Sequence, residues 1–165
     1  MKYLAPPRTV PAFLGFGALM LAPAAAEGAI NVSADPERGT VTVTADAGTS
    51  DELYVTDHSC RGSCFPSSIS VASETTPLVA GANCIKLTYP DGSTQVQCGI
   101  AAELVSVDSG DGNDEVTVGG TSAFRPTYSV VLGDGDDVGH EYKTTDSTID
   151  GGAGDDVIDG LHTVL

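Results

Sequence analysis

Aspartate and glycine recur together near the C-terminus of this chain, in a spacing that suits the binding of a hard cation. Three nine-residue segments carry the pattern: 109–117 (SGDGNDEVT), 132–140 (LGDGDDVGH) and 151–159 (GGAGDDVID). Each segment has Asp at its sixth position. Calcium prefers carboxylate and carbonyl oxygens, and glycine lets backbone carbonyls approach an ion closely. The pattern therefore predicts calcium-binding loops.

The sixth-position aspartates are the strongest candidate ligands: Asp114, Asp137 and Asp156. Other acids of the same loops are secondary candidates: Asp111, Asp134, Asp136 and Asp155. One six-residue loop is too short to surround calcium, which takes about six to eight oxygen ligands, so two stacked loops must share each ion. We expect about two Ca²⁺ ions, one between 109–114 and 132–137 and one between 132–137 and 151–156.

Magnesium, a transition metal or no metal at all are the alternatives to calcium. Magnesium requires tight octahedral geometry and keeps its water, and a transition metal would prefer His or Cys. His140 and His162 lie near the loops, but an isolated His is more typical of a surface than of a metal site. Acid-glycine segments can also be simple solvated turns, although this does not explain why Asp recurs at the sixth position.

The strands that hold these loops follow from the same period. Tiling the chain backwards in nine-residue units, with Glu141 and residues 118–122 as insertions, assigns one inward residue to each unit. These are Val107, Val116, Val130, Gly139, Ile149 and Ile158. Five are β-branched, which suits short buried strands. Val138 replaces Gly139 if Glu141 marks a one-residue slip. Acidic and non-acidic units alternate, so we expect the acidic loops to stack along one edge.

The segment 151–159 fits G-G-x-G-x-D-x-U-x at every specified position, where U is a large apolar residue. The chain thereby resembles the RTX (hemolysin-type) calcium-binding repeat proteins, whose repeats form a parallel β-roll. The resemblance covers roughly residues 84–165, and residues 46–55 (DAGTSDELYV) are a fainter relative. It implies an all-β fold with a short β-roll. Three residues depart from the repeat, Ser109, Leu132 and Gly139, and only one edge carries acidic loops, whereas the family carries ions along both.

The N-terminus has the features of a secretory signal peptide. Lys2 and Arg8 precede the apolar run 12–22 and the small residues 24–26. We therefore expect residues 1–26 to be removed and the protein to be secreted. The apolar run is too short to span a membrane. RTX toxins typically carry a C-terminal export signal instead, so the resemblance does not extend to toxin or pore function.

Residues 27–99 predict a β region that precedes the β-roll of residues 100–165. Alternating apolar residues predict strands at 40–45, 51–56 and 67–72. No helical periodicity is convincing after the signal segment.

Four cysteines in an exported chain indicate disulfides. The sequence Pro90-Asp91-Gly92 fits a hairpin turn, and counting outward from this turn pairs Cys84 with Cys98. This leaves Cys60 and Cys64 for a local disulfide. The alternative is a zinc site that combines these two cysteines with His58.

The acidic composition narrows the possible functions. The chain has a formal net charge of −16, which opposes binding to nucleic acid or to an anionic membrane. No nucleophile, metalloprotease or phosphate-binding motif is present, so we expect no enzyme.

The first hypothesis for the function is a secreted calcium-binding protein whose β-roll folds on binding. The alternative is a structural or adhesive extracellular β-solenoid protein without functional calcium binding. The last repeat has no evident cap, which suggests a truncated or dimer-capped roll.

Overall fold

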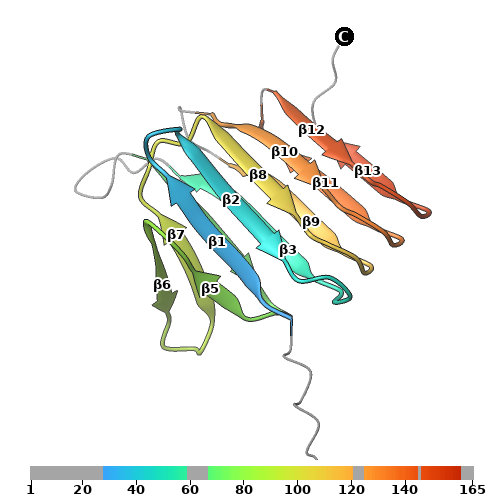
Figure 1. Cartoon of the computed structure of the whole chain (residues 1–165), viewed down its shortest axis with the longest axis horizontal. Coiled ribbons are helices and arrows are strands. Elements are labelled where there is room, and N and C mark those ends of the chain that lie inside the picture. The colour runs from blue at the N-terminus through green and yellow to red at the C-terminus, as the bar shows by residue number, and fades with distance from the viewer. Residues whose placement is uncertain (1–27, 59–66, 121–124, 145, 161–165) are drawn as a thin grey trace, which may run out of the picture.

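The protein is all β wherever the computed structural model describes it, in residues 28–58, 67–120, 125–144 and 146–160 (Figure 1). Thirteen strands form two sheets in these residues, so the expected all-β fold is confirmed. No helix among the described residues is long and apolar enough to cross a membrane.

The first sheet has six strands and the second has seven. In spatial order, the first contains β12 (Ser147–Asp150), β10 (Thr127–Val131), β8 (Leu104–Asp108), β2 (Thr40–Ala45), β1 (Ile30–Asp35) and β5 (Leu78–Ala80). The second contains β13 (Val157–Gly160), β11 (Val138–Tyr142), β9 (Glu115–Gly120), β3 (Glu52–His58), β4 (Ser68–Ser73), β7 (Thr94–Cys98) and β6 (Cys84–Thr88).

Each sheet contains one run of four parallel strands. The runs are β2, β8, β10 and β12 in the first sheet, and β3, β9, β11 and β13 in the second. The chain passes from β2 to β3, β8 to β9, β10 to β11 and β12 to β13, which makes four stacked coils (Figure 1). Antiparallel pairs such as β1 with β2 and β3 with β4 extend both sheets. The sheets are therefore mixed. Each sheet pairs strands from residues 27–99 with strands from residues 100–165, which are the two regions that the sequence indicates.

The space between the two parallel runs is lined by the positions that the nine-residue tiling assigns to the interior. Neighbours across the strands are Val107, Val130 and Ile149 in the first sheet, and Val116, Gly139 and Ile158 in the second. The three valines of this set are at most 2% exposed and belong to the main hydrophobic core. Their burial stabilises the fold by removing apolar surface from water. The predicted phase of the strands is confirmed.

Gly139 occupies an inward position because its neighbours already fill the space. A Cβ added there would lie 3.1 Å from Ile149 Cγ2 and 3.4 Å from Leu132 Cδ1. Leu132 is fully buried, and it stands where the repeat pattern has glycine. The two departures of segment 132–140 thus compensate in volume. The pairing of β9 with β11 stays in register throughout, so the alternative in which Val138 turns inward is wrong.

The last coil exposes its apolar side chains. Ile158 is 48% exposed and Val157 is 57% exposed. Ile158 shares its register with Gly139, so it lies on the inward face of β13, but β13 is the edge strand of its sheet. The expectation that Ile158 is buried in the interior is therefore wrong, because the described residues provide no further coil to cover it.

The strands predicted for 40–45, 51–56 and 67–72 are present as β2, β3 and β4, with ends shifted by at most two residues. β1 and β5 were not expected from the sequence. β1 directly follows the apolar signal segment, and β5 has only three residues, which is too short for an alternating pattern to identify.

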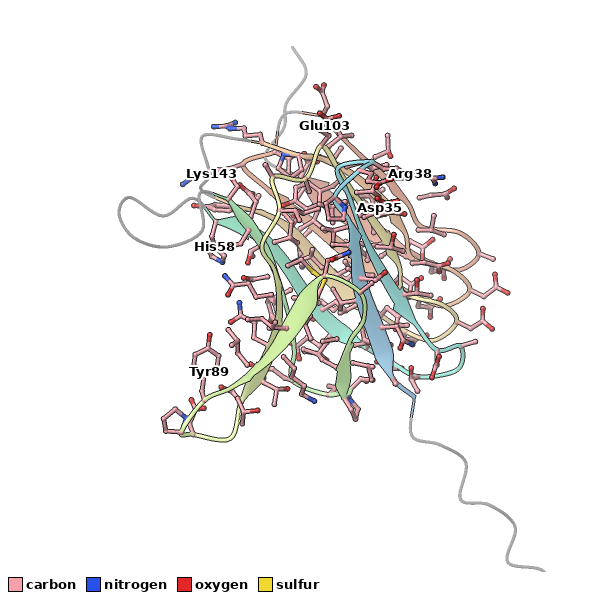
Figure 2. All side chains as sticks on the ribbon, turned by 60° about the vertical axis from the view of Figure 1, so that its left-hand side comes forward. Asp35, Arg38, His58, Tyr89, Glu103 and Lys143 are labelled. Carbon is pink, nitrogen blue, oxygen red and sulfur yellow. A yellow bond between two sulfur atoms is a disulfide. The ribbon has the colours of Figure 1, made fainter. Side chains whose placement is uncertain are left out.

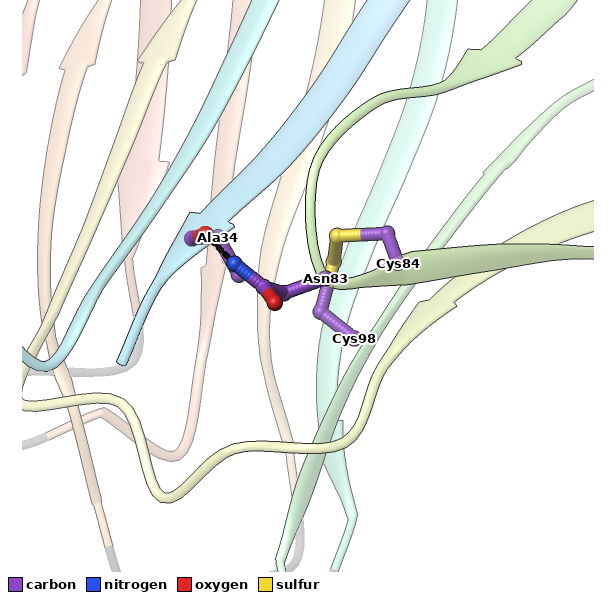
Figure 3. Close-up of a disulfide and its surroundings, with 4 residues drawn as sticks. All are labelled: Ala34, Asn83, Cys84 and Cys98. Carbon is purple, nitrogen blue, oxygen red and sulfur yellow. Dashed lines mark hydrogen bonds between the residues drawn. A yellow bond between two sulfur atoms is a disulfide. The ribbon is translucent and has the colours of Figure 1, made fainter.

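The predicted hairpin and its disulfide are both present. Tyr89 N–H donates to the Ser93 carbonyl at 2.9 Å across the turn, and Gly92 has the positive φ of +89° that the turn requires. Cys84 and Cys98 lie opposite each other and are bonded (Figure 3). The predicted Cys60–Cys64 pair, the signal segment and His162 fall outside the described residues.

Candidate metal centre

Three acidic loops lie on one another at one edge of the molecule, as the alternation of units predicts. They span residues 109–114, 132–137 and 151–156, and each connects the first sheet to the second. Asp134 forms parallel backbone bridges with Asp111 on one side and with Ala153 on the other. Figure 1 shows these loops as a row of turns where β8, β10 and β12 end. The backbone thus brings together the loops that carry all seven predicted ligands.

A fourth loop, 46–51, lies against loop 109–114 and connects β2 to β3. Gly48 N–H donates to the Asp111 carbonyl at 2.8 Å, and Asn113 N–H donates to the Ser50 hydroxyl at 3.2 Å. This loop belongs to the segment of faint sequence likeness, and β3 pairs with β9 in the register which that likeness implies. We call the four loops the loop stack. Its three contacts are the first, second and third loop interfaces, counted from loop 46–51.

Glycine is required where successive loops touch. Gly133 has φ of +110°, and a Cβ added to it would lie 1.7 Å from the Gly110 carbonyl oxygen. Gly152 has φ of +86°, and its Cβ would lie 1.9 Å from the Gly133 carbonyl oxygen. A side chain at either position would push the loops apart. Backbone carbonyl oxygens therefore lie directly against the next loop at the second and third interfaces.

The sixth-position aspartates form a column through the loop stack. Each places its Oδ1 atom on the backbone N–H of the equivalent residue in the preceding loop. The bonds run from Asp51 N–H to Asp114 at 2.8 Å, from Asp114 N–H to Asp137 at 2.8 Å, and from Asp137 N–H to Asp156 at 3.1 Å. Each interface consequently contains one of the three strongest predicted ligands.

Two of these carboxylates are buried with one oxygen unpaired. Asp114 is 2% exposed and Asp137 is 1% exposed. The Oδ2 atom of each is inaccessible and has no hydrogen-bond partner among the described residues. An unsatisfied buried polar atom costs on the order of 1–3 kcal/mol, and an unpaired charge costs more. These oxygens thus favour a proton or a cation at their interfaces.

Burial also perturbs the acidity of Asp114. Loss of solvation raises the pKa of its carboxyl group from 3.8 to about 6, and the charges of Asp51 and Asp137 act in the same direction. Hydrogen bonding by the Asp51 N–H and by the Ser109 side chain opposes this shift in pKa. A neighbouring cation would counteract the rise, because it favours the charged carboxylate.

The two ends of the column differ from its middle. Asp51 is buried, but its carboxylate accepts hydrogen bonds from the hydroxyl groups of Thr76 and Thr49. Asp156 is only half-buried, because its loop lies at the open end of the stack. The most desolvated unpaired oxygens therefore lie at the first and second interfaces.

The secondary candidates lie on the exposed side of the loops. They are Asp111, Asp134, Asp136 and Asp155. Asp155 N–H donates to Asp136 Oδ1 at 2.9 Å, and Asp136 N–H donates to Asn113 Oδ1 at 3.1 Å. This outer ladder holds the loops in register. Its side chains remain open to solvent, unlike those of Asp114 and Asp137.

The described histidines interact elsewhere. The His140 ring lies between Asp159, at 3.1 Å from Nδ1, and Glu115, at 3.9 Å from Nε2. His58 Nε2 lies 2.9 Å from the Thr56 hydroxyl, and the cysteines of the alternative zinc site are outside the described residues.

Side-chain clusters of three or more His, Cys, Asp or Glu suited to a metal are absent from the described residues. At the loop stack, the oxygens that lie against the neighbouring loop at the glycine positions are instead backbone carbonyls. The sequence did not identify Asp51, Thr49 or Thr76 as part of this region. The only available signal was the likeness of Asp51-Glu52-Leu53 to Asp114-Glu115-Val116.

Comparisons with known proteins were made at the level of family models, curated proteins and solved structures, and none of them matches this chain.

Proposed function

We propose that this protein is secreted and binds Ca²⁺ at its loop stack, with about two ions held at the second and third loop interfaces. The buried, unpaired Oδ2 atom of Asp137 carries this proposal. It belongs to a column of acids that repel one another, and calcium would neutralise that charge. Asp137 and Asp156 would supply carboxylates, and carbonyls of the stacked glycine loops would supply further oxygens.

The arrangement suits calcium better than other cations. Calcium tolerates irregular sets of carboxylate and carbonyl oxygens, whereas magnesium requires compact octahedral geometry and retains water. The side chains that would favour a transition metal interact elsewhere in the described residues: His140 contacts Asp159 and Glu115, and Cys84 and Cys98 form a disulfide.

We further propose that the four parallel coils are a short β-roll of the RTX type. Support comes from the repeat motif, from the two parallel strand runs and from the stacking of the acidic loops on one edge. In such a roll, calcium binding and folding are linked, because the ion binds only when two loops lie together. The acidic loops would be loose at low calcium and ordered outside the cell.

Calorimetric titration with calcium tests this function. We expect saturable binding of calcium and a much weaker response to magnesium. An Asp137→Asn variant should bind more weakly at the second interface, where its carboxylate lies, and should keep the third, because its backbone N–H still positions Asp156. Glu103→Gln removes an equal charge before β8, at the opposite end of that strand from loop 109–114 (Figure 2), and should bind like the unmodified protein.

The alternative is a structural or adhesive extracellular protein in which the acids only maintain solubility. Exposed apolar side chains on the last coils favour a contact surface of this kind, among them Val131, Tyr142 and Val157. Absence of calcium-binding heat at millimolar concentrations would support this alternative and rule out the calcium-binding function.

A further inference from the structure

The first loop interface differs from the other two because one of its walls, loop 46–51, lacks the acid-glycine repeat. We infer that this interface is a third cation site, in which Asp114 supplies the carboxylate and loop 46–51, whose Asp51 lies 63 residues away in the chain, forms the opposite wall. The inference rests on the proposed function, since it assigns calcium to one more interface of the same stack. It depends on a different buried oxygen, Asp114 Oδ2, from the one that supports the second interface.

The position of Asp114 is fixed by loop 46–51. Its Oδ1 atom accepts the Asp51 N–H at 2.8 Å, so the carboxylate lies at the first interface and not the second. The whole residue is 2% exposed, and its Oδ2 atom has no partner among the described residues. A buried carboxylate held in this way has one oxygen available to a ligand.

A backbone oxygen of loop 46–51 also lies at this interface. A Cβ added to Gly112 would lie 2.0 Å from the Thr49 carbonyl oxygen, so this oxygen stands directly against loop 109–114. The first interface therefore contains a carbonyl oxygen as well as the unpaired Asp114 Oδ2, and calcium takes ligands of both kinds.

The wall formed by Asp51 is already ordered by other contacts. Thr76, between β4 and β5, donates its hydroxyl to Asp51 Oδ1, and Thr75 Oγ1 accepts the Glu52 N–H at 3.1 Å. These contacts join loop 46–51 to the antiparallel strands. A cation at the first interface would therefore connect the repeat coils to the disulfide-containing part of the fold.

The number of bound ions tests the inference. Equilibrium dialysis of the purified protein against calcium, with enough salt to screen exposed acids, should give three ions per chain. Asp114→Asn and Asp156→Asn should each lower this number to two, since they remove the carboxylates of the first and the third interface. Glu103→Gln, at the other end of the strands, should leave three.

Two ions in the unmodified protein, or an unchanged number in Asp114→Asn, would overturn the third site and leave the proposed function intact. No bound ions would overturn both. If Asp114→Asn does not fold, the number for the unmodified protein decides: three ions support the site, and two or fewer contradict it.

Discussion

At the scale of single residues, the important feature is how Asp114 and Asp137 use their two carboxylate oxygens. One oxygen accepts a backbone N–H from the preceding loop, and the other is buried with no partner among the described residues. The first contact orients the carboxylate, and the second oxygen is the one that our proposal assigns to calcium. Neither residue is satisfied as a purely structural acid, unlike Asp51 with its hydroxyl donors.

Replacing Asp137 by Asn should have opposite effects with and without calcium. The Asn Oδ1 atom can still accept the Asp114 N–H, while the buried charge is removed. In chelator the variant should be as stable as the unmodified protein or more so. In calcium it should lose about 3 kcal/mol, the stabilisation given by one site at a hundredfold excess over Kd.

Urea unfolding of both proteins, with calcium and with chelator, measures these effects. Equal destabilisation under both conditions would mean that Asp137 has a structural role only. Glu103→Gln serves as the charge-matched control.

Asp114 should make the metal-free protein more stable in mild acid. Its pKa is raised from 3.8 to about 6 in the folded protein, so between these pH values the folded state binds more protons than the unfolded state. Stability should therefore rise as pH falls from 7 to 4, by up to about 3 kcal/mol from this residue. Urea unfolding against pH in chelator tests this, and an Asp114→Asn variant should show a smaller rise. An identical pH profile in the variant would contradict the prediction.

At the scale of loops and strands, close stacking depends on glycines that no other residue can replace. Gly152 and Gly48 have nearly equal positive φ values, +86° and +83°. They differ in their surroundings, since a Cβ on Gly152 would collide with the Gly133 carbonyl, whereas nothing lies within 4 Å of a Cβ on Gly48. Comparing Ala substitutions at these two positions therefore distinguishes the cost of backbone strain from the cost of disturbing the stacked loops.

Ala at position 48 should cost only the strain of a left-handed conformation, about 1–2 kcal/mol. Ala at position 152 should cost this amount and also weaken calcium binding, because the third interface must open. Denaturation and calcium titration of Gly48→Ala and Gly152→Ala measure the difference. Equal effects on stability and binding would show that the loops are not stacked as described.

The compensation between Leu132 and Gly139 gives a prediction about packing. Gly139→Val restores the usual apolar residue but would crowd Leu132 and Ile149, at a cost of about 1–3 kcal/mol. A Leu132→Ala change in the same protein should recover part of this loss, although it destabilises the protein by itself. A double-mutant cycle in urea tests the coupling, and strictly additive effects would contradict it.

The sequence predicted those elements whose local pattern repeats. Asp at the sixth position of each acidic segment identifies the stacked loops, and the inward position two places later, which is β-branched in two of the three segments, sets the strand phase because a strand alternates its faces. The first coil was not predicted, because loop 46–51 has no glycine pattern and its partner lies 63 residues away. The direction in which each carboxylate points was also not predictable, because it depends on a hydrogen bond to another loop. Ile158 was misassigned because spacing indicates the face of a strand but not whether another strand covers it.

At the scale of the whole molecule, the acidic loop stack and the disulfide hairpin lie in different parts of one pair of sheets (Figure 1). The hairpin of β6 and β7 ends the second sheet on one side, where Cys84–Cys98 holds it without any ion. The last coil ends the sheets on the other side, with exposed apolar residues and the half-buried Asp156. We therefore expect order to depend least on calcium near the hairpin and most in the last coils.

Far-UV circular dichroism with thermal unfolding, first in chelator and then in millimolar calcium, tests the dependence of the loop stack on calcium most directly. We predict that calcium increases the β signal and raises Tm, because the ion binds the folded loops and not the unfolded chain. The chelator should reverse both changes. An identical β signal and an identical Tm in chelator and in calcium would contradict a calcium-dependent loop stack.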